Sequence, residues 1–405
     1  PGTNKYYLHS FHKDQPDLNW QNPVLREEIY RMINWWLDKG IAGFRIDAII
    51  NIKKDLEWRS LPSDRENGLV PVPESLVNAQ SIEPFLQELK ERTFAKYNAF
   101  TVGEVFNETD EELHFFIGKD GVFSSIFDFK QTMLGQEGKG WFDHALPTAD
   151  ELKESIFQAH ERADSIGILS TIIENHDEPR GVSHYIAEGP VNDTSKKALG
   201  TIQVLRKGIP FIYQGQEIGM ENQVFESVED FDDIATINGY HVAKEAGLSE
   251  EEALAVIANY SRDNARTPMQ WTREPGLGFS DGPAWLISPK PDYSINVEDQ
   301  EKDPDSILNY YRQLTALYRH PLYGNTIRFG DMIPAYRDRE NIIAFERRGD
   351  KRLLIVSNFQ NRQASLDLPA SIETVILNNV TGLFQEGDQV LELAPYQTIV
   401  LELAE

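Results

Sequence analysis

The amino-acid sequence predicts an α/β protein in which a parallel sheet is followed by a small antiparallel β domain. Two patterns predict this class. Apolar runs of strand length alternate with amphipathic helical stretches over most of the chain, and from about Asn325 short strands joined by tight turns take over. The 405 residues are enough for one large domain and one smaller one. We therefore expect an α/β domain over 1–324 and an all-β sandwich domain over 325–405.

The stretch 43–50, Gly-Phe-Arg-Ile-Asp-Ala-Ile-Ile, predicts the first strand of the sheet. Six of its eight residues are apolar or glycine, which is typical of a strand buried on both faces. Before it, Asn22 and Pro23 predict the start of a helix, because asparagine caps helices and proline suits their first position. We expect the apolar stripe of this helix, together with Trp35 and Trp36, to pack in the core.

Helices and strands alternate along the rest of the α/β domain. Further strands are expected at 100–105, 124–129, 167–173 and 209–213, and helices at 85–94, 149–162, 194–206 and 306–319. A long excursion, 221–305, follows the last of these strands. The sequence contains no glycine-rich phosphate loop of a nucleotide-binding fold. Polar residues instead follow the C-terminal ends of the strands, where a (β/α)8 TIM barrel carries its catalytic groups.

The predicted barrel is incomplete in this chain. Only about five barrel strands can be counted in the sequence, whereas a barrel of this kind closes with eight. We therefore expect the N-terminal strands to be missing from this chain, and a missing N-terminal barrel segment to be its partner.

Composition and charge exclude several classes of function. The 65 acidic and 39 basic residues give a formal charge of −26, which repels nucleic acid and anionic membranes and favours a neutral substrate. No apolar run is long enough for a membrane span, and no secretory leader begins the chain. The absence of cysteine excludes disulfides and fits a cytoplasmic location. No cluster of side chains at metal-ligand spacing appears, so we expect no metal or cofactor in this chain.

Three strand-end carboxylates, Asp47, Glu104 and Asp177, predict acid–base chemistry on a sugar. Retaining glycoside hydrolysis needs an ionised carboxylate that attacks the anomeric carbon and a protonated carboxyl group that releases the leaving group. Arg45 precedes Asp47 by two residues, on the same side of the strand, where its charge favours the ionised form. His176 lies beside Asp177, where both side chains can bind sugar hydroxyls.

The chain resembles the α-amylase family of glycoside hydrolases. The stretches 43–48, 101–105 and 174–180 are similar to three signature regions of this family. Other segments resemble its branch of oligo-1,6-glucosidases, dextran glucosidases and α-glucosidases. These are the Gln-Pro-Asp-Leu-Asn run at 15–19 and the segments 214–220 and 262–271. The resemblance covers essentially the whole chain.

This resemblance implies a retaining, exo-acting α-glucosidase that releases glucose from the non-reducing end of short α-glucosides. It implies that Asp47 is the nucleophile, that Glu104 is the acid/base, and that Asp177 stabilises the transition state. Arg45 and His176 match residues of the family that orient the nucleophile and bind the sugar at the cleavage site.

Two further residues are candidates for substrate binding. Arg266 matches an arginine of the family that helps to close the pocket over the non-reducing-end glucose, although a loop salt bridge is an alternative role. Asn107, just past the predicted acid/base, is a candidate contact for the aglycone, with a loop cap as the alternative.

The sequence departs from the family pattern in three places. The calcium loop of the family has no counterpart here and would lie in the missing N-terminal part. Ala48 follows the predicted nucleophile, where valine is typical of α-1,6 specialists and alanine or threonine suits α-1,4 linkages. Glu174 occupies a position where asparagine is usual, which we expect to add charge near the aglycone.

Other activities stay open within the resemblance. One alternative is an oligo-1,6-glucosidase or dextran glucosidase specialised for α-1,6 links. Another is a sucrose isomerase or transglucosidase, although the charged motif of the isomerases is not evident after Asp177. A trehalose-6-phosphate hydrolase would need cations near the aglycone, against which the expected charge of Glu174 argues. A catalytically silent sugar-binding or transporter-associated homologue is the non-enzymatic alternative, but such homologues lack the carboxylates present here.

Overall fold

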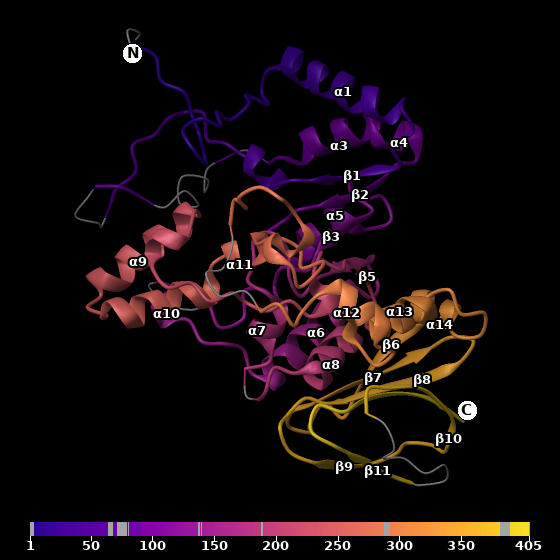
Figure 1. The fold of residues 1–405 in the computed structure, drawn as a ribbon. Helices are drawn as coiled ribbons and strands as arrows, with labels where there is room; N and C mark the ends of the chain where they lie inside the picture. The colour runs from indigo at the N-terminus through magenta and orange to yellow at the C-terminus, as the bar shows by residue number, and fades with distance from the viewer. Residues whose placement is uncertain are drawn as a thin grey trace. The chain divides into compact units, whose positions relative to one another are not determined.

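The computed structural model describes residues 4–63, 68–70, 79, 81–136, 138, 140–187, 189–286, 292–380 and 389–404. The chain divides into two compact units. Unit 1 consists of Pro1–Phe127 and Arg162–Leu169, and unit 2 of Asp128–Glu161 and Ser170–Glu405 (Figure 1). These bounds differ from the predicted domains 1–324 and 325–405, which stay a prediction.

Unit 1 contains the first three parallel strands and the helices beside them. Its elements are α1 (Pro23–Leu37), β1 (Gly43–Ile46), η1 (Ile49–Ile52), α3 (Glu83–Arg92), α4 (Phe94–Tyr97), β2 (Phe100–Gly103), α5 (Asp110–Ile117) and β3 (Ser125–Phe127). β1 pairs with β2 and β2 with β3, both in parallel, as predicted. Asn22 caps α1 by accepting a hydrogen bond from the Val24 N–H at 3.0 Å, and Pro23 is its first residue.

Two predictions about burial in unit 1 are wrong. β1 ends at Ile46, four residues earlier than predicted, and its side chains are half-buried or exposed. Trp35 and Trp36 are 52% and 42% exposed. The physical reason is the direction in which α1 packs: the helix buries Tyr30 and Leu37, and the two tryptophans precede Leu37 by one and two residues, about 100° and 200° around the helix.

Unit 2 carries the next two parallel strands, their helices and the predicted excursion. The barrel-type elements are α6 (Ala149–Ala163), β4 (Leu169–Thr171), α7 (Gly181–Tyr185), α8 (Asp193–Leu205), β5 (Ile209–Pro210), η3 (Gln216–Ile218) and α13 (Ile307–Leu317). β4 and β5 pair in parallel. The helix α13 lies within the predicted helix 306–319 and buries Tyr310 and Tyr311 in the core.

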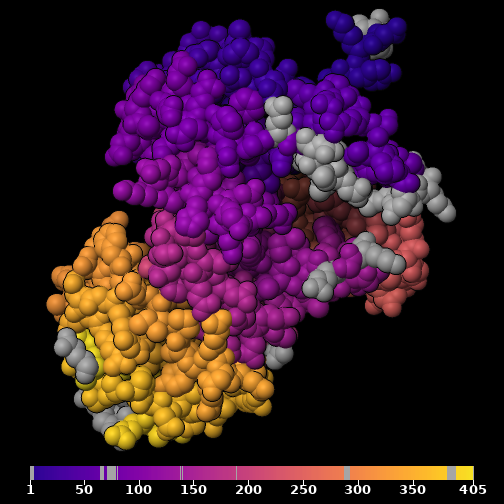
Figure 2. Space-filling model, turned by 180° about the vertical axis from the view of Figure 1, so that it is seen from behind, coloured from indigo at the N-terminus to yellow at the C-terminus, as the bar shows by residue number. Residues whose placement is uncertain are grey.

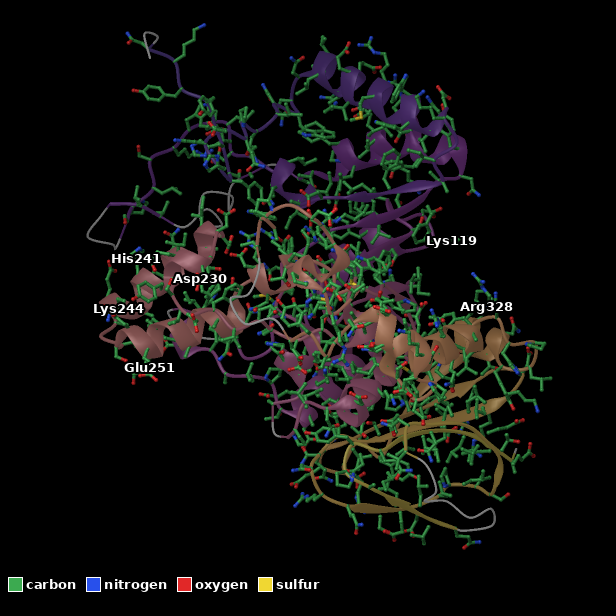
Figure 3. The ribbon with its side chains drawn as sticks, in the orientation of Figure 1. Lys119, Asp230, His241, Lys244, Glu251 and Arg328 are labelled. Atoms are coloured by element: carbon green, nitrogen blue, oxygen red, sulfur yellow. The ribbon has the colours of Figure 1, made fainter. Side chains whose placement is uncertain are left out.

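The excursion folds into helices of its own. These are η4 (Val228–Asp230), α9 (Ile234–Glu245), α10 (Glu250–Tyr260), α11 (Asp263–Arg266), η5 (Pro275–Gly278) and α12 (Val297–Lys302). Ser249 caps α10 and exchanges hydrogen bonds with Glu252, so each satisfies a backbone N–H of the first turn. Polar side chains such as His241 and Glu251 project from α9 and α10 into solvent (Figure 3).

The C-terminal part of unit 2 is antiparallel, as predicted. Its strands are β6 (Asp331–Ala335), β7 (Ile342–Arg348), β8 (Arg352–Asn358), β9 (Ala364–Asp367), β10 (Ile372–Asn378), β11 (Val390–Leu393) and β12 (Thr398–Leu403), and α14 (Gly324–Phe329) precedes them. Five strands pair in the order β10-β12-β8-β7-β6, and β11 pairs with β9. Figure 2 shows the surface of this C-terminal part as a continuous region coloured orange to yellow.

Side-chain alternation gives the five-stranded sheet two buried faces. Ile343 and Phe345 of β7 pack into the core formed with α8 and α13. Ile342 and Ala344 of the same strand pack into a second core with Leu391 and other residues of the two-stranded sheet. The sheet therefore forms a sandwich with β9 and β11 while its other face covers the barrel helices.

None of the helices in the described ranges combines the length and apolar character that a membrane crossing requires.

Candidate active site

The site in unit 1 is built where β1 and β2 end. Asp47 follows β1 directly, and Glu104 follows β2 directly. One guanidinium holds both carboxyl groups: Arg45 Nη1 donates to Asp47 Oδ1, and its Nη2 donates to Glu104 Oε2 at 2.6 Å. The structure therefore brings the predicted nucleophile and the predicted acid/base together on a single arginine.

Small residues permit this close approach of the strands. A Cβ atom on Gly43 would lie 1.7 Å from the Phe100 carbonyl oxygen of β2. A Cβ atom on Gly103 would lie 2.5 Å from the ring of Phe123. Since Gly103 immediately precedes Glu104, the glycine lets β2 lie against that ring and fixes where the carboxyl group leaves the strand.

The two carboxyl groups have different environments. The Glu104 side chain is only 7% exposed, whereas that of Asp47 is 73% exposed. Burial raises the pKa of Glu104 above its ordinary value, and the hydrogen bond and charge of Asp47 raise it too. The Ala48 N–H, 2.8 Å from Glu104 Oε2, and the charge of Arg45 oppose this shift in the pKa. Ala48 has a left-handed backbone with φ of 41°, which directs its N–H to Glu104.

Asn107 lies beside a cavity of about 530 Å³ in unit 1. The cavity is also lined by Val105 and Phe106, which directly follow Glu104, and by Ile50 and Asn51 of η1. Asn107 has a left-handed backbone with φ of 58°, so it also turns the chain after β2. A place in the wall of a cavity beside the predicted acid/base is compatible with a contact to the aglycone.

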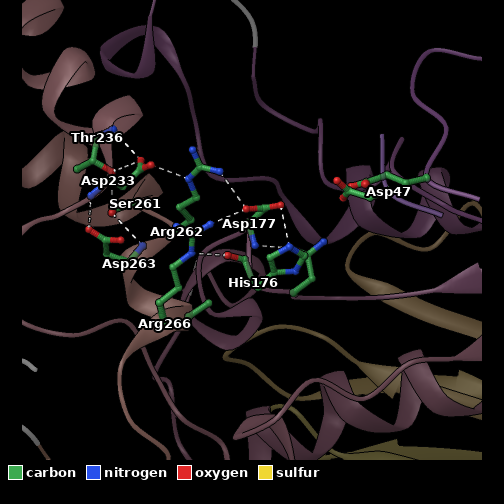
Figure 4. A network of polar contacts seen from close by, with 12 residues as sticks. Asp47, His176, Asp177, Asp233, Thr236, Ser261, Arg262, Asp263 and Arg266 are labelled. Atoms are coloured by element: carbon green, nitrogen blue, oxygen red, sulfur yellow. Dashed lines mark hydrogen bonds and ion pairs between the residues drawn. The ribbon is translucent and has the colours of Figure 1, made fainter. Parts of the chain in front are cut away.

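The site in unit 2 is centred on Asp177, in the loop after β4 (Figure 4). Two arginines donate to its Oδ1: Arg262 Nη1 at 2.9 Å and Arg266 Nη2 at 2.7 Å. Its Oδ2 lies 3.1 Å from His176 Nε2, and Arg266 Nε donates to the His176 carbonyl at 2.9 Å. His176, Asp177 and Arg266 thus lie in contact in unit 2. Sequence reasoning missed Arg262, although it belongs to the segment 262–271 that was singled out.

Arg262 is itself held by a buried polar network of the excursion. Its Nε donates to Asp233 Oδ1 at 2.7 Å, and Asp233 caps α9 by accepting from the Thr236 N–H at 2.8 Å. Asp263 accepts the Asp233 N–H at 3.0 Å, and Thr236 bonds to Ser261 at 2.8 Å (Figure 4). The start of α9 and the start of α11 are therefore tied together at the arginine that contacts Asp177.

The expectation that Glu174 adds charge near the aglycone is wrong. Its side chain is fully buried and forms an ion pair with Arg180, Oε1 to Nη1 at 2.9 Å. The partner lies six residues further along the chain, in the same stretch 174–180. The carboxylate is neutralised inside unit 2 rather than presented to a ligand.

Within the ranges that the structure describes, no group of three or more His, Asp or Glu side chains is placed to hold a metal ion. The ionisable side chains described above in the two sites are carboxylates, guanidinium groups and one imidazole.

Comparison with known proteins places the chain in a family. The Alpha-amylase family model, described as the alpha amylase catalytic domain, matches residues 2–322. Probable oligo-1,6-glucosidase 3 of Bacillus subtilis (strain 168) is 37% identical over 404 residues, which cover 98% of this chain and 71% of that protein. Trehalose-6-phosphate hydrolase of the same organism is 32% identical over 413 residues, covering 99% of this chain and 71% of that protein.

A solved structure gives the same result for the fold. The isomaltulose synthase SmuA from Protaminobacter rubrum superposes with a TM-score of 0.90 at 32% identity, covering 100% of this chain and 72% of that chain. The match confirms the predicted (β/α)8 barrel class with a C-terminal antiparallel domain. The chain belongs to the α-amylase family of glycoside hydrolases.

Proposed function

We propose that this glycoside hydrolase is a retaining, exo-acting α-glucosidase that releases glucose from the non-reducing end of short α-glucosides of the maltose or isomaltose type. Relatives named as oligo-1,6-glucosidases support this activity. The proposal includes a small neutral oligosaccharide as substrate, which suits a chain with a formal charge of −26. It also includes a cytoplasmic location, with which the absence of cysteine is compatible.

The proposed mechanism has two displacements. In the first, a carboxylate oxygen of Asp47 attacks the anomeric carbon while Glu104 protonates the glycosidic oxygen, so the aglycone leaves and a β-glucosyl ester forms on Asp47. In the second, Glu104 takes a proton from water, which attacks the same carbon and releases α-glucose. Asp177 and His176 bind sugar hydroxyls and stabilise the positive charge that develops on the ring.

The observation that carries this proposal is the shared guanidinium of Arg45. It contacts Asp47 and Glu104 at once, and the two carboxyl groups differ in exposure by a factor of about ten, 73% against 7%. An exposed carboxylate beside a cation suits the nucleophile, and a buried carboxyl group with a raised pKa suits the acid. The non-enzymatic alternative leaves this arrangement without a purpose.

Substrate binding is proposed for two further residues. Arg266 shares Asp177 with Arg262, so a sugar hydroxyl bound to Asp177 also meets a guanidinium, as expected at a closed pocket for the terminal glucose. Asn107 is proposed as an aglycone contact because it lines the cavity that Val105 and Phe106 share just after Glu104.

Three other aglycones or acceptors stay as alternatives. An α-1,6 specialist is favoured by the oligo-1,6-glucosidase relatives, whereas Ala48 favours α-1,4 linkages. The similarity to an isomaltulose synthase supports transfer of glucose to fructose as a second candidate. Trehalose 6-phosphate stays open because the buried Glu174 no longer argues against a phosphate.

Parallel assays of maltose, isomaltose, sucrose, trehalose and trehalose 6-phosphate test the proposed function. We expect glucose release from maltose or isomaltose at the highest kcat/KM, and the ratio of these two values assigns the linkage. Formation of isomaltulose from sucrose in excess of free glucose would replace the hydrolase by an isomerase. Absence of turnover and of binding with all five sugars would contradict the proposal.

A further inference from the structure

A buried ion pair closes the loop that carries His176 and Asp177. Glu174 stands at the start of this loop and Arg180 at its end, and their side chains are 0% and 1% exposed. Glu174 Oε1 accepts from Arg180 Nη1 at 2.9 Å, and its Oε2 accepts from the Gly181 N–H at 2.6 Å. Both carboxylate oxygens are therefore used to fix the two ends of the loop against each other.

The same arginine reaches the loop that follows β5. Arg180 Nη1 also donates to the Gln214 carbonyl at 2.8 Å, and its guanidinium lies over the ring of Tyr213, 5.4 Å from the centroid. The Tyr213 hydroxyl in turn donates to the Ala265 carbonyl at 3.0 Å. Ala265 immediately precedes Arg266, so these contacts connect the loop of Asp177 to the helix that carries one of its arginines.

Space around the pair is fully used. A Cβ atom on Gly181 would lie 2.6 Å from the Ile173 carbonyl, and one on Gly215 would lie 2.4 Å from the Met220 sulfur and 3.1 Å from Arg180 Nη1. The loop ends therefore have little freedom to move while the ion pair is intact. Because desolvation offsets much of the attraction between buried charges, such a pair is a weak source of stability and a strong source of fixed geometry.

We propose that Glu174 and Arg180 are positioning residues for the active site, on the basis of the function proposed above. Through the loop ends they hold Asp177 and His176, and through Tyr213 and Ala265 they hold Arg266, in the arrangement that binds the transition state. Neither residue touches the substrate. Replacing Glu174 or Arg180 should weaken binding of the charged transition state in the molecules that are folded, beyond any loss of folded protein.

The substitution E174Q tests this inference. Glutamine keeps the volume and one acceptor oxygen but leaves the buried guanidinium of Arg180 without a counter-charge. The decisive readout is the inhibition constant for 1-deoxynojirimycin, a cationic analogue of the glucosyl transition state, because this constant does not depend on the fraction of active molecules. We expect it to rise at least tenfold, with a similar fall in kcat/KM.

The matched control is E346Q, which removes the charge of a carboxylate whose side chain is 7% exposed and which pairs with Arg352 at 2.8 Å in the C-terminal sheet. E346Q should leave the inhibition constant unchanged even where it lowers the melting temperature. An unchanged constant in E174Q, with activity reduced only in proportion to the folded fraction, would overturn the inference.

A second variant decides the matter where E174Q does not fold. Y213F keeps the ring under Arg180 and removes only the hydrogen bond to Ala265, so a raised inhibition constant supports the inference and an unchanged one overturns it.

The wild-type protein separates the two proposals. If it neither hydrolyses α-glucosides nor binds 1-deoxynojirimycin, the proposed function itself fails.

Discussion

Replacing Asp47 by asparagine should lower kcat/KM for α-glucosides by about 10⁴-fold or more, because the amide cannot form the glucosyl ester. The protein should stay folded, since the Asp47 side chain is 73% exposed and its loss leaves no buried cavity. The measurement is the kinetics of p-nitrophenyl α-glucoside hydrolysis, with circular dichroism to check the fold.

The control is D55N, because Asp55 is a nearby aspartate that also pairs with an arginine, Arg59, at 3.8 Å. It should retain most of the activity.

Azide distinguishes a nucleophile from a residue that merely supports one. With D47G and α-glucosyl fluoride, azide should enter from the opposite face and give β-glucosyl azide. Substantial hydrolysis by D47N, or no azide product with D47G, would count against the assignment.

Replacing Glu104 by glutamine should lower hydrolysis of maltose by about 10²–10⁴-fold, the contribution of a general acid. For substrates whose leaving groups need no proton, the substitution should lower the rate of the first displacement much less. With E104A, azide should attack the glucosyl ester and give α-glucosyl azide, the opposite anomer to that from D47G. The control is E346Q, which removes a similarly buried carboxylate, 7% exposed and paired with Arg352 in the C-terminal sheet, and which should retain most of the activity.

The pH dependence follows from the direction of the pKa shift of Glu104. Burial raises this pKa, and the acid form is the active one, so kcat/KM should fall as the pH rises through a value above that of an ordinary glutamate. This fall should be absent in E104Q. Glu178 is the rival source, because burial raises its pKa to about 7 and it adjoins Asp177. If E178Q rather than E104Q abolished the fall of kcat/KM at high pH, the assignment of Glu104 as the general acid would be wrong.

Sequence patterns predicted the local structure because the signals are local. Asn22 and Pro23 start α1, and Ser249 with Glu252 starts α10, since capping depends on residues within one turn. The alternation of β7 and β8 predicted antiparallel strands. The strand ends themselves were not predicted: the expected strands 43–50 and 100–105 include Asp47 and Glu104, whereas β1 ends at Ile46 and β2 at Gly103.

Packing partners could not be predicted in the same way. Periodicity shows that Trp36 shares a stripe with Leu37, but it does not show that α1 turns Leu37 inward and leaves Trp36 42% exposed. The sequence shows that Glu174 is charged but not which residue pairs with it. We therefore expected an exposed carboxylate, whereas the Glu174 side chain is buried in an ion pair with Arg180. The contact of Arg262 with Asp177 spans 85 residues of chain and follows from no local pattern; Arg266, 89 residues from Asp177, was identified only through the family resemblance.

The stereochemistry of the first product tests the retaining mechanism most directly. Hydrolysis of p-nitrophenyl α-glucoside can be followed by proton NMR, in which the two anomers of glucose have separate signals. The arrangement of Asp47 and Glu104 around Arg45 predicts that α-glucose forms first and that β-glucose follows only through mutarotation. Initial formation of β-glucose would show a single displacement by water and would contradict the role of Asp47 as nucleophile.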